Sequence, residues 1–168
     1  TIGSYIFSSC KSLTTITIAE GNQKYDSRDN CNAIIETQKN TLIIGCQGTT
    51  IPNSVTTIGA EAFYACPQLT SIIIPNSVTT IGFLAFGNCT KLTSITIPNS
   101  VTTIESQAFS DCSSLTSITL SNRITTIEAS VFEGCSRLTS ITIPNSVTTI
   151  GYMAFEKCQG LTSITLPN

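Results

Sequence analysis

The sequence lacks histidine and tryptophan entirely, and charged residues make up only 11% of it, against ~25% in an average soluble domain. Without histidine, neither a Ser-His-Asp triad nor a Cys-His pair can form, and no glycine-rich phosphate loop occurs. The sequence therefore predicts a protein that is not an enzyme and that uses no cofactor.

Clustered positive charge and long apolar runs are missing too. The 8 Lys and Arg are scattered and the net charge is −2, so nucleic acid is not an expected partner. No apolar stretch approaches the ~20 residues that cross a bilayer. The N-terminal TIGSYIFSSC has no basic region before an apolar run, so no signal peptide is visible. The chain opens and stops within a repeat, and we expect it to be an excerpt.

Hydroxyl side chains are abundant instead, with 28 Thr and 21 Ser, and they recur with a strict period. Internal repeats are sought first, because they decide the architecture. A Phe, a Cys three residues later and a Leu three residues after that each return every 23 residues. The Phe positions are Phe63, Phe86, Phe109, Phe132 and Phe155.

Each repeat predicts short local elements. In LTSITIP, Ile95 and Ile97 point to one side and Ser94 and Thr96 to the other, which is typical of a half-buried strand. The spacing of Ala108, Phe109 and Cys112 indicates one short helical turn. Stacked copies would bury their apolar sides against one another, although a single copy could not. We expect one parallel sheet from strands at 70–74, 93–97, 116–120, 139–143 and 162–166.

Strings such as LTSITIPNSVTTIGYMAFEKC resemble the BspA-like class of leucine-rich repeats, closely over 51–168 and as a partial repeat over 1–18. The resemblance implies an α/β solenoid, a right-handed coil with a concave parallel sheet, short convex strands and short helical turns. It also implies a surface or secreted protein of a bacterium or protist, acting in adhesion. We expect residues 1–168 to form a single solenoid domain.

The segment 19–50 breaks the period, because Phe7 to Phe63 is ten residues longer than two repeats. Residues 19–40 hold seven of the eighteen charges, and NAIIE and TLIIG flanking TQKN predict a β-hairpin. A turn centred on 38–39 would pair Ile35 with Leu42 and Ile34 with Ile43. Asp26, Arg28 and Asp29 are candidate ligand-binding residues of this insert, and Asp26, Asp29 and Asn30 could also offer oxygens to calcium.

Six of the eight cysteines, Cys10 and the five periodic ones, share one repeat position and are expected to form a buried column. Neighbours about 5 Å apart with parallel Cβ vectors bridge poorly, so free thiols are expected. Without histidine or a CxxC pair, no metal site is predicted. Cys31 and Cys46 are either a disulfide or merely neighbours across the hairpin.

The outward side of the predicted sheet is uncharged and rich in hydroxyls, and repeat proteins commonly bind ligands on such a face. An alternative is that Thr simply suits strands. The candidate ligand residues on this face are Ile73, Thr93, Ser94, Thr96, Thr116, Ser117, Thr119, Thr139, Ser140 and Thr142.

The function that the sequence favours is a non-catalytic recognition module of a cell-surface or secreted protein. Its partner would be a protein or a glycan, bound in cell adhesion or host attachment. A structural spacer with no ligand site of its own is the alternative, and an ice-binding hydroxyl ladder is a minor one. The sequence does not identify the ligand.

Overall fold

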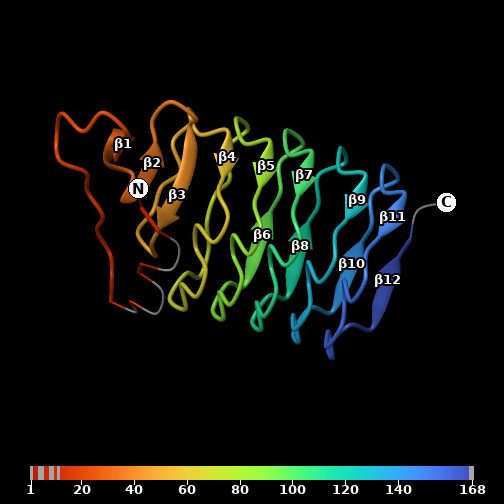
Figure 1. Ribbon diagram of the computed structural model, residues 1–168. Coiled ribbons are helices and arrows are strands. Elements are labelled where there is room, and N and C mark those ends of the chain that lie inside the picture. The colour runs from red at the N-terminus through yellow and green to blue at the C-terminus, as the bar shows by residue number, and fades with distance from the viewer. Residues whose placement is uncertain (1, 4–5, 8–9, 11, 167–168) are drawn as a thin grey trace.

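The computed structural model describes residues 2–3, 6–7, 10 and 12–166 as a β-solenoid of stacked coils. Figure 1 shows the coils following one another from the N-terminal to the C-terminal end, with short strands in two rows. Within the described residues, no helix is long and apolar enough to cross a bilayer.

Most strands are only two or three residues long, because each coil turns sharply at Pro, Asn and Gly. The elements are β1 (Tyr25–Asp26), η1 (Arg28–Asn30), β2 (Ala33–Glu36), β3 (Thr41–Gly45), β4 (Thr57–Ile58), β5 (Thr80–Ile81), β6 (Ser94–Thr96), β7 (Thr103–Ile104), β8 (Ser117–Thr119), β9 (Thr126–Ile127), β10 (Ser140–Thr142), β11 (Thr149–Ile150) and β12 (Ser163–Thr165).

The Thr-Ile strands form the upper row of Figure 1. They belong to a six-stranded sheet in the order β1-β2-β3-β4-β5-β7, which is parallel from β3 onward, and to a separate β9-β11 pair. In-register pairing sets Ile58 beside Ile81 and Ile81 beside Ile104. This alignment gives the core one continuous aliphatic column.

The Ser-Ile-Thr strands form two separate parallel pairs, β6-β8 and β10-β12, and not the single sheet that the sequence predicts. The expected strand at 70–74 is also wrong, since no strand forms there. Both interruptions adjoin coils that depart from the common ITIP string. One coil has Ile73 in place of Thr, and the other has Leu120 and Ser121 in place of Ile and Pro.

The predicted short helical turns are wrong for the regular repeats. The only helix among the described residues is η1, in the insert. Each Phe segment instead contains two residues with positive φ four positions apart, which interrupts a right-handed helix. These pairs are Glu61 and Ala65, Leu84 and Asn88, Gln107 and Asp111, Ser130 and Gly134, and Met153 and Lys157.

The positive φ values direct the turn amides toward the next coil. The Phe86 N–H donates to the Ala108 carbonyl at 2.8 Å, and the Phe109 N–H donates to the Val131 carbonyl at 3.0 Å. The backbone groups that a helix would pair internally therefore join one coil to the next. These bonds form a third ladder along the solenoid, beside the two rows of strands.

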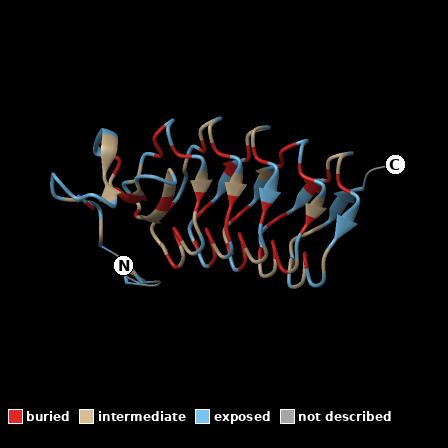
Figure 2. Cartoon of the chain, turned by 45° about the horizontal axis from the view of Figure 1, so that its top comes forward, coloured by how far each residue is buried: buried red, intermediate tan, exposed pale blue. Residues whose placement is uncertain are grey.

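The core lies between the two rows of strands and runs through the length of the solenoid (Figure 2). Its centre is the predicted Phe column, stacked nearly face to face. Ring centroids are 5.1 Å apart for Phe63 and Phe86, 5.4 Å for Phe86 and Phe109, and 5.9 Å for Phe109 and Phe132. Each of these four rings is at most 1% exposed.

The periodic cysteines lie beside the Phe column as free thiols. The Cys112 Sγ donates to the Phe86 carbonyl at 3.2 Å. Cys89, Cys135 and Cys158 each make the same bond to the Phe carbonyl of the coil before their own. Each thiol thus reaches a carbonyl of the preceding coil, which an alanine would not do. Cys10 departs from the predicted column, because it is exposed.

In the insert, β2 and β3 pair antiparallel across the turn at 37–40, and β1 pairs with β2. Ile35 lies opposite Leu42, but a bulge shifts the register, so Ile34 faces Ile44 and not Ile43. Cys31 and Cys46 are buried free thiols in two different apolar clusters. Of the two alternatives predicted for this pair, the structure therefore has the one without a disulfide.

Candidate functional site

The Ser–Thr face is defined here as the outward side chains of Ser94, Thr96, Ser117, Thr119, Ser140 and Thr142. Parallel register sets Ser94 beside Ser117 and Thr96 beside Thr119 on β6 and β8. All six side chains are exposed, and their hydroxyls make no hydrogen bond within the described part of the chain. The face therefore offers regularly spaced donors and acceptors, without a charge, to a ligand.

A second Thr column, at the start of each strand, has a different role. The hydroxyls of Thr93 and Thr116 donate to the backbone carbonyls of Thr70 and Thr93 at 3.3 and 3.1 Å. Thr162 donates in the same way to Thr139. Thr93 and Thr116 were predicted as ligand residues, but their hydroxyls bond to the preceding coil. Thr139, also predicted, takes part only through its carbonyl.

This difference can be measured as stability. We expect Thr116→Val to lower the free energy of unfolding by about 0.5–1.5 kcal/mol, because it removes the side-chain bond to Thr93. Thr119→Val is the matched control and should change stability by less than about 0.5 kcal/mol, since its hydroxyl bonds to nothing described. Urea denaturation of both variants tests the assignment. Equal losses of unfolding free energy in the two variants would mean that the Thr116 hydroxyl bond does not stabilise the fold.

Ile73 occupies in its coil the position that Thr96 and Thr119 occupy in theirs, and it is 85% exposed. It borders two open hollows on the same side of the solenoid as the Ser–Thr face, one of which Ser94 and Thr96 also line. The predicted exposure of Ile73 is therefore confirmed, and the residue adjoins the candidate face.

The candidate residues of the insert divide into two kinds. Arg28 binds the Asp26 carboxylate with two bonds, Nε to Oδ1 at 2.7 Å and Nη2 to Oδ2 at 2.6 Å. The Arg28 bonds, with help from the Thr37 hydroxyl, lower the pKa of Asp26 to about 2 against a partial desolvation. Arg28 also donates to Asn40, which ties the segment to the turn at 37–40.

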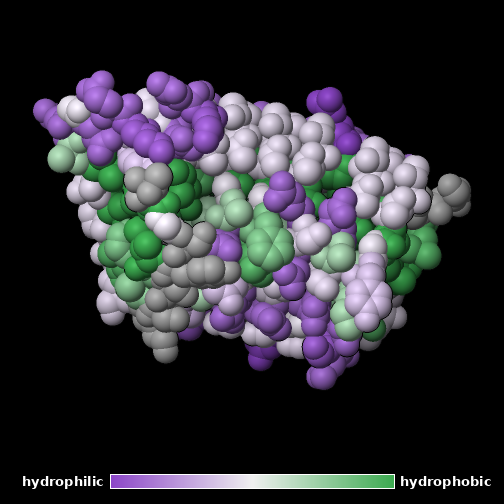
Figure 3. Space-filling model, viewed as in Figure 1, coloured by the Kyte–Doolittle hydropathy of each residue, from purple (hydrophilic) through white to green (hydrophobic). Residues whose placement is uncertain are grey.

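Because Asp26 is engaged in this way, its oxygens serve the fold of the insert. Asp29 is exposed and has a positive φ of 58°. Among the described residues, no three His, Cys, Asp or Glu side chains are grouped to hold a metal ion. Figure 3 shows hydrophilic surface over the β1 end of the solenoid, and paler surface along the upper edge, where β4, β5 and β7 lie.

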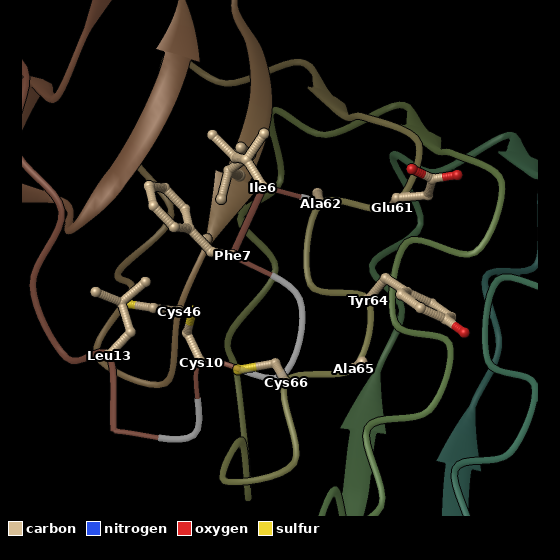
Figure 4. Close-up of a pocket in the computed structure, with 12 residues that line it drawn as sticks. Ile6, Phe7, Cys10, Leu13, Cys46, Glu61, Ala62, Tyr64, Ala65 and Cys66 are labelled. Atoms are coloured by element: carbon tan, nitrogen blue, oxygen red, sulfur yellow. The ribbon is translucent and has the colours of Figure 1, made fainter. Parts of the chain in front are cut away.

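One pocket was not predicted from the sequence. It lies between the N-terminal segment and the coil at 61–66, has a volume of about 40 Å³, and is lined by Ile6, Phe7, Leu13, Tyr64 and three cysteines, among others. Figure 4 shows Cys10, Cys46 and Cys66 gathered at one end of it, away from the Glu61 carboxylate. The available signal was the segment 19–50, which breaks the 23-residue period between Phe7 and Phe63.

Comparison with known proteins agrees with the repeat geometry. A family model for the BspA type leucine rich repeat region matches residues 1–45 and 43–162, in six copies. No curated protein matches the chain. A leucine-rich repeat protein from Eubacterium ventriosum is 27% identical, with a TM-score of 0.87, over 98% of this chain and 45% of its own.

Two further solved structures are similar. A leucine-rich repeat protein from Bacteroides ovatus is 30% identical over 99% of this chain and 40% of its own, with a TM-score of 0.75. A leucine rich cell surface protein from Faecalibacterium prausnitzii is 34% identical over 96% of this chain and 38% of its own, with a TM-score of 0.66. The chain spans less than half the length of each of these three proteins. With its repeat, its stacked coils and these matches, the chain belongs to the BspA-type leucine-rich repeat family.

Proposed function

We propose that this chain is a non-catalytic recognition module of a cell-surface or secreted protein, and that its ligand, a protein or a glycan, binds the Ser–Thr face. The observation that carries the proposal is the set of exposed, in-register hydroxyls on β6, β8, β10 and β12 that bond to nothing within the described chain. An uncharged face of this kind suits a ligand that is recognised by hydrogen bonds and shape.

The surface location draws support from a relative. The Faecalibacterium prausnitzii protein, which is 34% identical, is described as a leucine rich cell surface protein. A role in adhesion or host attachment follows from that location and from the long, regular face. The insert supplies a second candidate contact through Asp29, with Asp26 and Arg28 positioning the segment around it.

Binding to a panel of purified extracellular-matrix proteins and to a glycan array tests this function. The probing variant is Thr96→Lys/Thr119→Lys/Thr142→Lys, which puts three bulky charges on the Ser–Thr face. We expect it to weaken binding of any panel ligand by about tenfold or more, because buried unpaired charge is costly.

The matched control is Thr103→Lys/Thr126→Lys/Thr149→Lys, which adds the same charge at exposed or half-buried threonines of β7, β9 and β11 whose hydroxyls bond to nothing in the described chain. It should bind within about threefold of the wild type. Circular dichroism and urea denaturation establish that both variants are folded. If the wild type binds no member of the panel, or if the control loses binding as much as the probing variant, the proposal fails and a structural spacer is favoured.

A further inference from the structure

Ile73 is the most exposed large apolar side chain of the described residues, at 85%. Single exposed apolar residues are common on protein surfaces and mean little alone. Here the surrounding coil is unusual as well. Burial alternates along it as in a strand, with Ile72 half-buried and Ile74 only 6% exposed, although no strand is formed.

The backbone of the segment from Ser71 to Ile74 has no hydrogen-bond partner within the described part of the chain, for either its N–H or its C=O groups. Pairing with the next coil stops at Thr70, whose carbonyl accepts both the N–H and the hydroxyl of Thr93. The equivalent segments β6 and β8 bond to each other in full register.

Open hollows flank the unpaired segment on both sides. One, of about 620 Å³, lies toward the preceding coil and is bordered by Thr50 and Asn53. The other, of about 340 Å³, lies toward the next coil and is bordered by Ser94 and Thr96. Ile73 stands between them and lines both. The missing pairing therefore leaves an apolar ridge with polar backbone on either side.

The residues that line the two hollows limit the chemical class of the ligand. None of the described residues that line the two hollows is charged, so a charged ligand would find no partner there. None is aromatic either, so there is no π face on which a sugar ring could stack. A peptide main chain carries one donor and one acceptor per residue and can satisfy unpaired backbone groups, while an apolar side chain covers the isoleucine.

We propose that Ile73 and the unpaired backbone of Ser71–Ile74 form the anchoring subsite of the Ser–Thr face, and that its ligand is an uncharged peptide segment of a partner protein with an apolar side chain seated on Ile73. The proposal rests on the recognition function above and adds to it the ligand class and the anchoring residue. The neighbouring Ser94 and Thr96 continue the contact onto the Ser–Thr face.

Selection of random dodecapeptides displayed on phage, against the immobilised full chain, tests the subsite. We expect enriched peptides to carry little charge and at least one large apolar residue. For a synthetic copy of such a peptide, Ile73→Thr should raise Kd by about tenfold or more, because it removes the apolar anchor and restores the common motif. Ile73→Val, which keeps the anchor, should stay within about threefold.

A transplanted anchor separates the side chain from the backbone. The double variant Ile73→Thr/Thr119→Ile places isoleucine on β8, whose backbone is paired. We expect it to bind as weakly as Ile73→Thr. Restored binding would show that the unpaired backbone contributes nothing. Enriched peptides that bind Ile73→Thr as tightly as the wild type would overturn the subsite altogether.

Experiments with the wild type and Ile73→Thr also test two other ligands for the subsite, a glycan and a second copy of the chain. Ile73-dependent binding to neutral oligosaccharides on an array, without peptide enrichment, would replace the peptide by a glycan. A wild-type dimer in sedimentation that Ile73→Thr makes monomeric would replace it by a second copy of the chain. Either result overturns this inference. The recognition function fails separately, through the three-lysine variants of the Ser–Thr face.

Discussion

Replacing Phe109 by alanine is expected to lower the free energy of unfolding by about 3–5 kcal/mol. The ring is fully buried and is stacked between Phe86 and Phe132 at 5.4 and 5.9 Å. Removing it deletes apolar contacts on both sides and leaves a cavity. Three ladders of hydrogen bonds hold the Phe109 coil to the Phe86 coil, and the turn ladder joins it to the Phe132 coil, so the cavity cannot collapse easily.

Urea denaturation followed by circular dichroism measures the effect. Phe83→Ala is the control, because Phe83 belongs to an adjacent coil but is 37% exposed and lies outside the stack. It should cost less than about 1.5 kcal/mol. A loss below about 1 kcal/mol for Phe109→Ala would mean that the Phe column does not hold the coils together.

The repeat allowed the core to be predicted, since residues 23 positions apart must occupy equivalent places in a stack of identical coils. Phe109, Leu115 and Ile95 follow from that argument and are buried. The turn geometry does not follow from it. Glu61 and Leu84 adopt a positive φ that their residue types disfavour, and they do so because the turn amides then reach the carbonyls of the next coil. No local sequence pattern indicates that a turn amide will bond to a carbonyl of the next coil.

The candidate site shows the same division. The alternation of LTSITIP predicted that Thr93 and Thr96 face outward, and both are exposed. The pattern could not tell that the Thr93 hydroxyl lies within bonding distance of a carbonyl in the preceding coil, whereas that of Thr96 does not. Likewise, Ile73 was recognisable as an outward isoleucine. The unpaired backbone around it was not, because it depends on the spacing between coils.

Raising the pH from 9 to 10 is expected to destabilise the protein steeply, because the fold holds a column of neutral thiols. Burial raises the pKa of Cys89, Cys112 and Cys135 far above the usual thiol value, and it raises that of Cys66 to about 11. In the unfolded chain the same thiols ionise near pH ~8.5. Above that pH the folded state binds more protons than the unfolded state, so unfolding is favoured as the pH rises.

The size of the effect follows from the number of thiols that stay neutral. Each contributes about 1.4 kcal/mol per pH unit once the unfolded thiols are ionised, so Cys89, Cys112 and Cys135 together approach about 4 kcal/mol per unit. Their stabilising contribution is complete below pH ~8.5 and is lost progressively above it. Urea midpoints measured between pH 7 and 10, under reducing conditions, should be flat at first and then fall.

A single substitution tests whether the buried thiol column causes the loss of stability at alkaline pH. Cys112→Ala loses one buried thiol, so the fall in stability should become shallower by about 1.4 kcal/mol per pH unit, whatever the variant's stability at pH 7. The Phe86 carbonyl keeps its bond from the Cys89 N–H at 3.2 Å, so no backbone group is left unpaired. All other groups of the chain are the same in both proteins. An unchanged slope in Cys112→Ala would show that the alkaline loss arises from those groups, and that the thiol column does not set the pH limit of the fold.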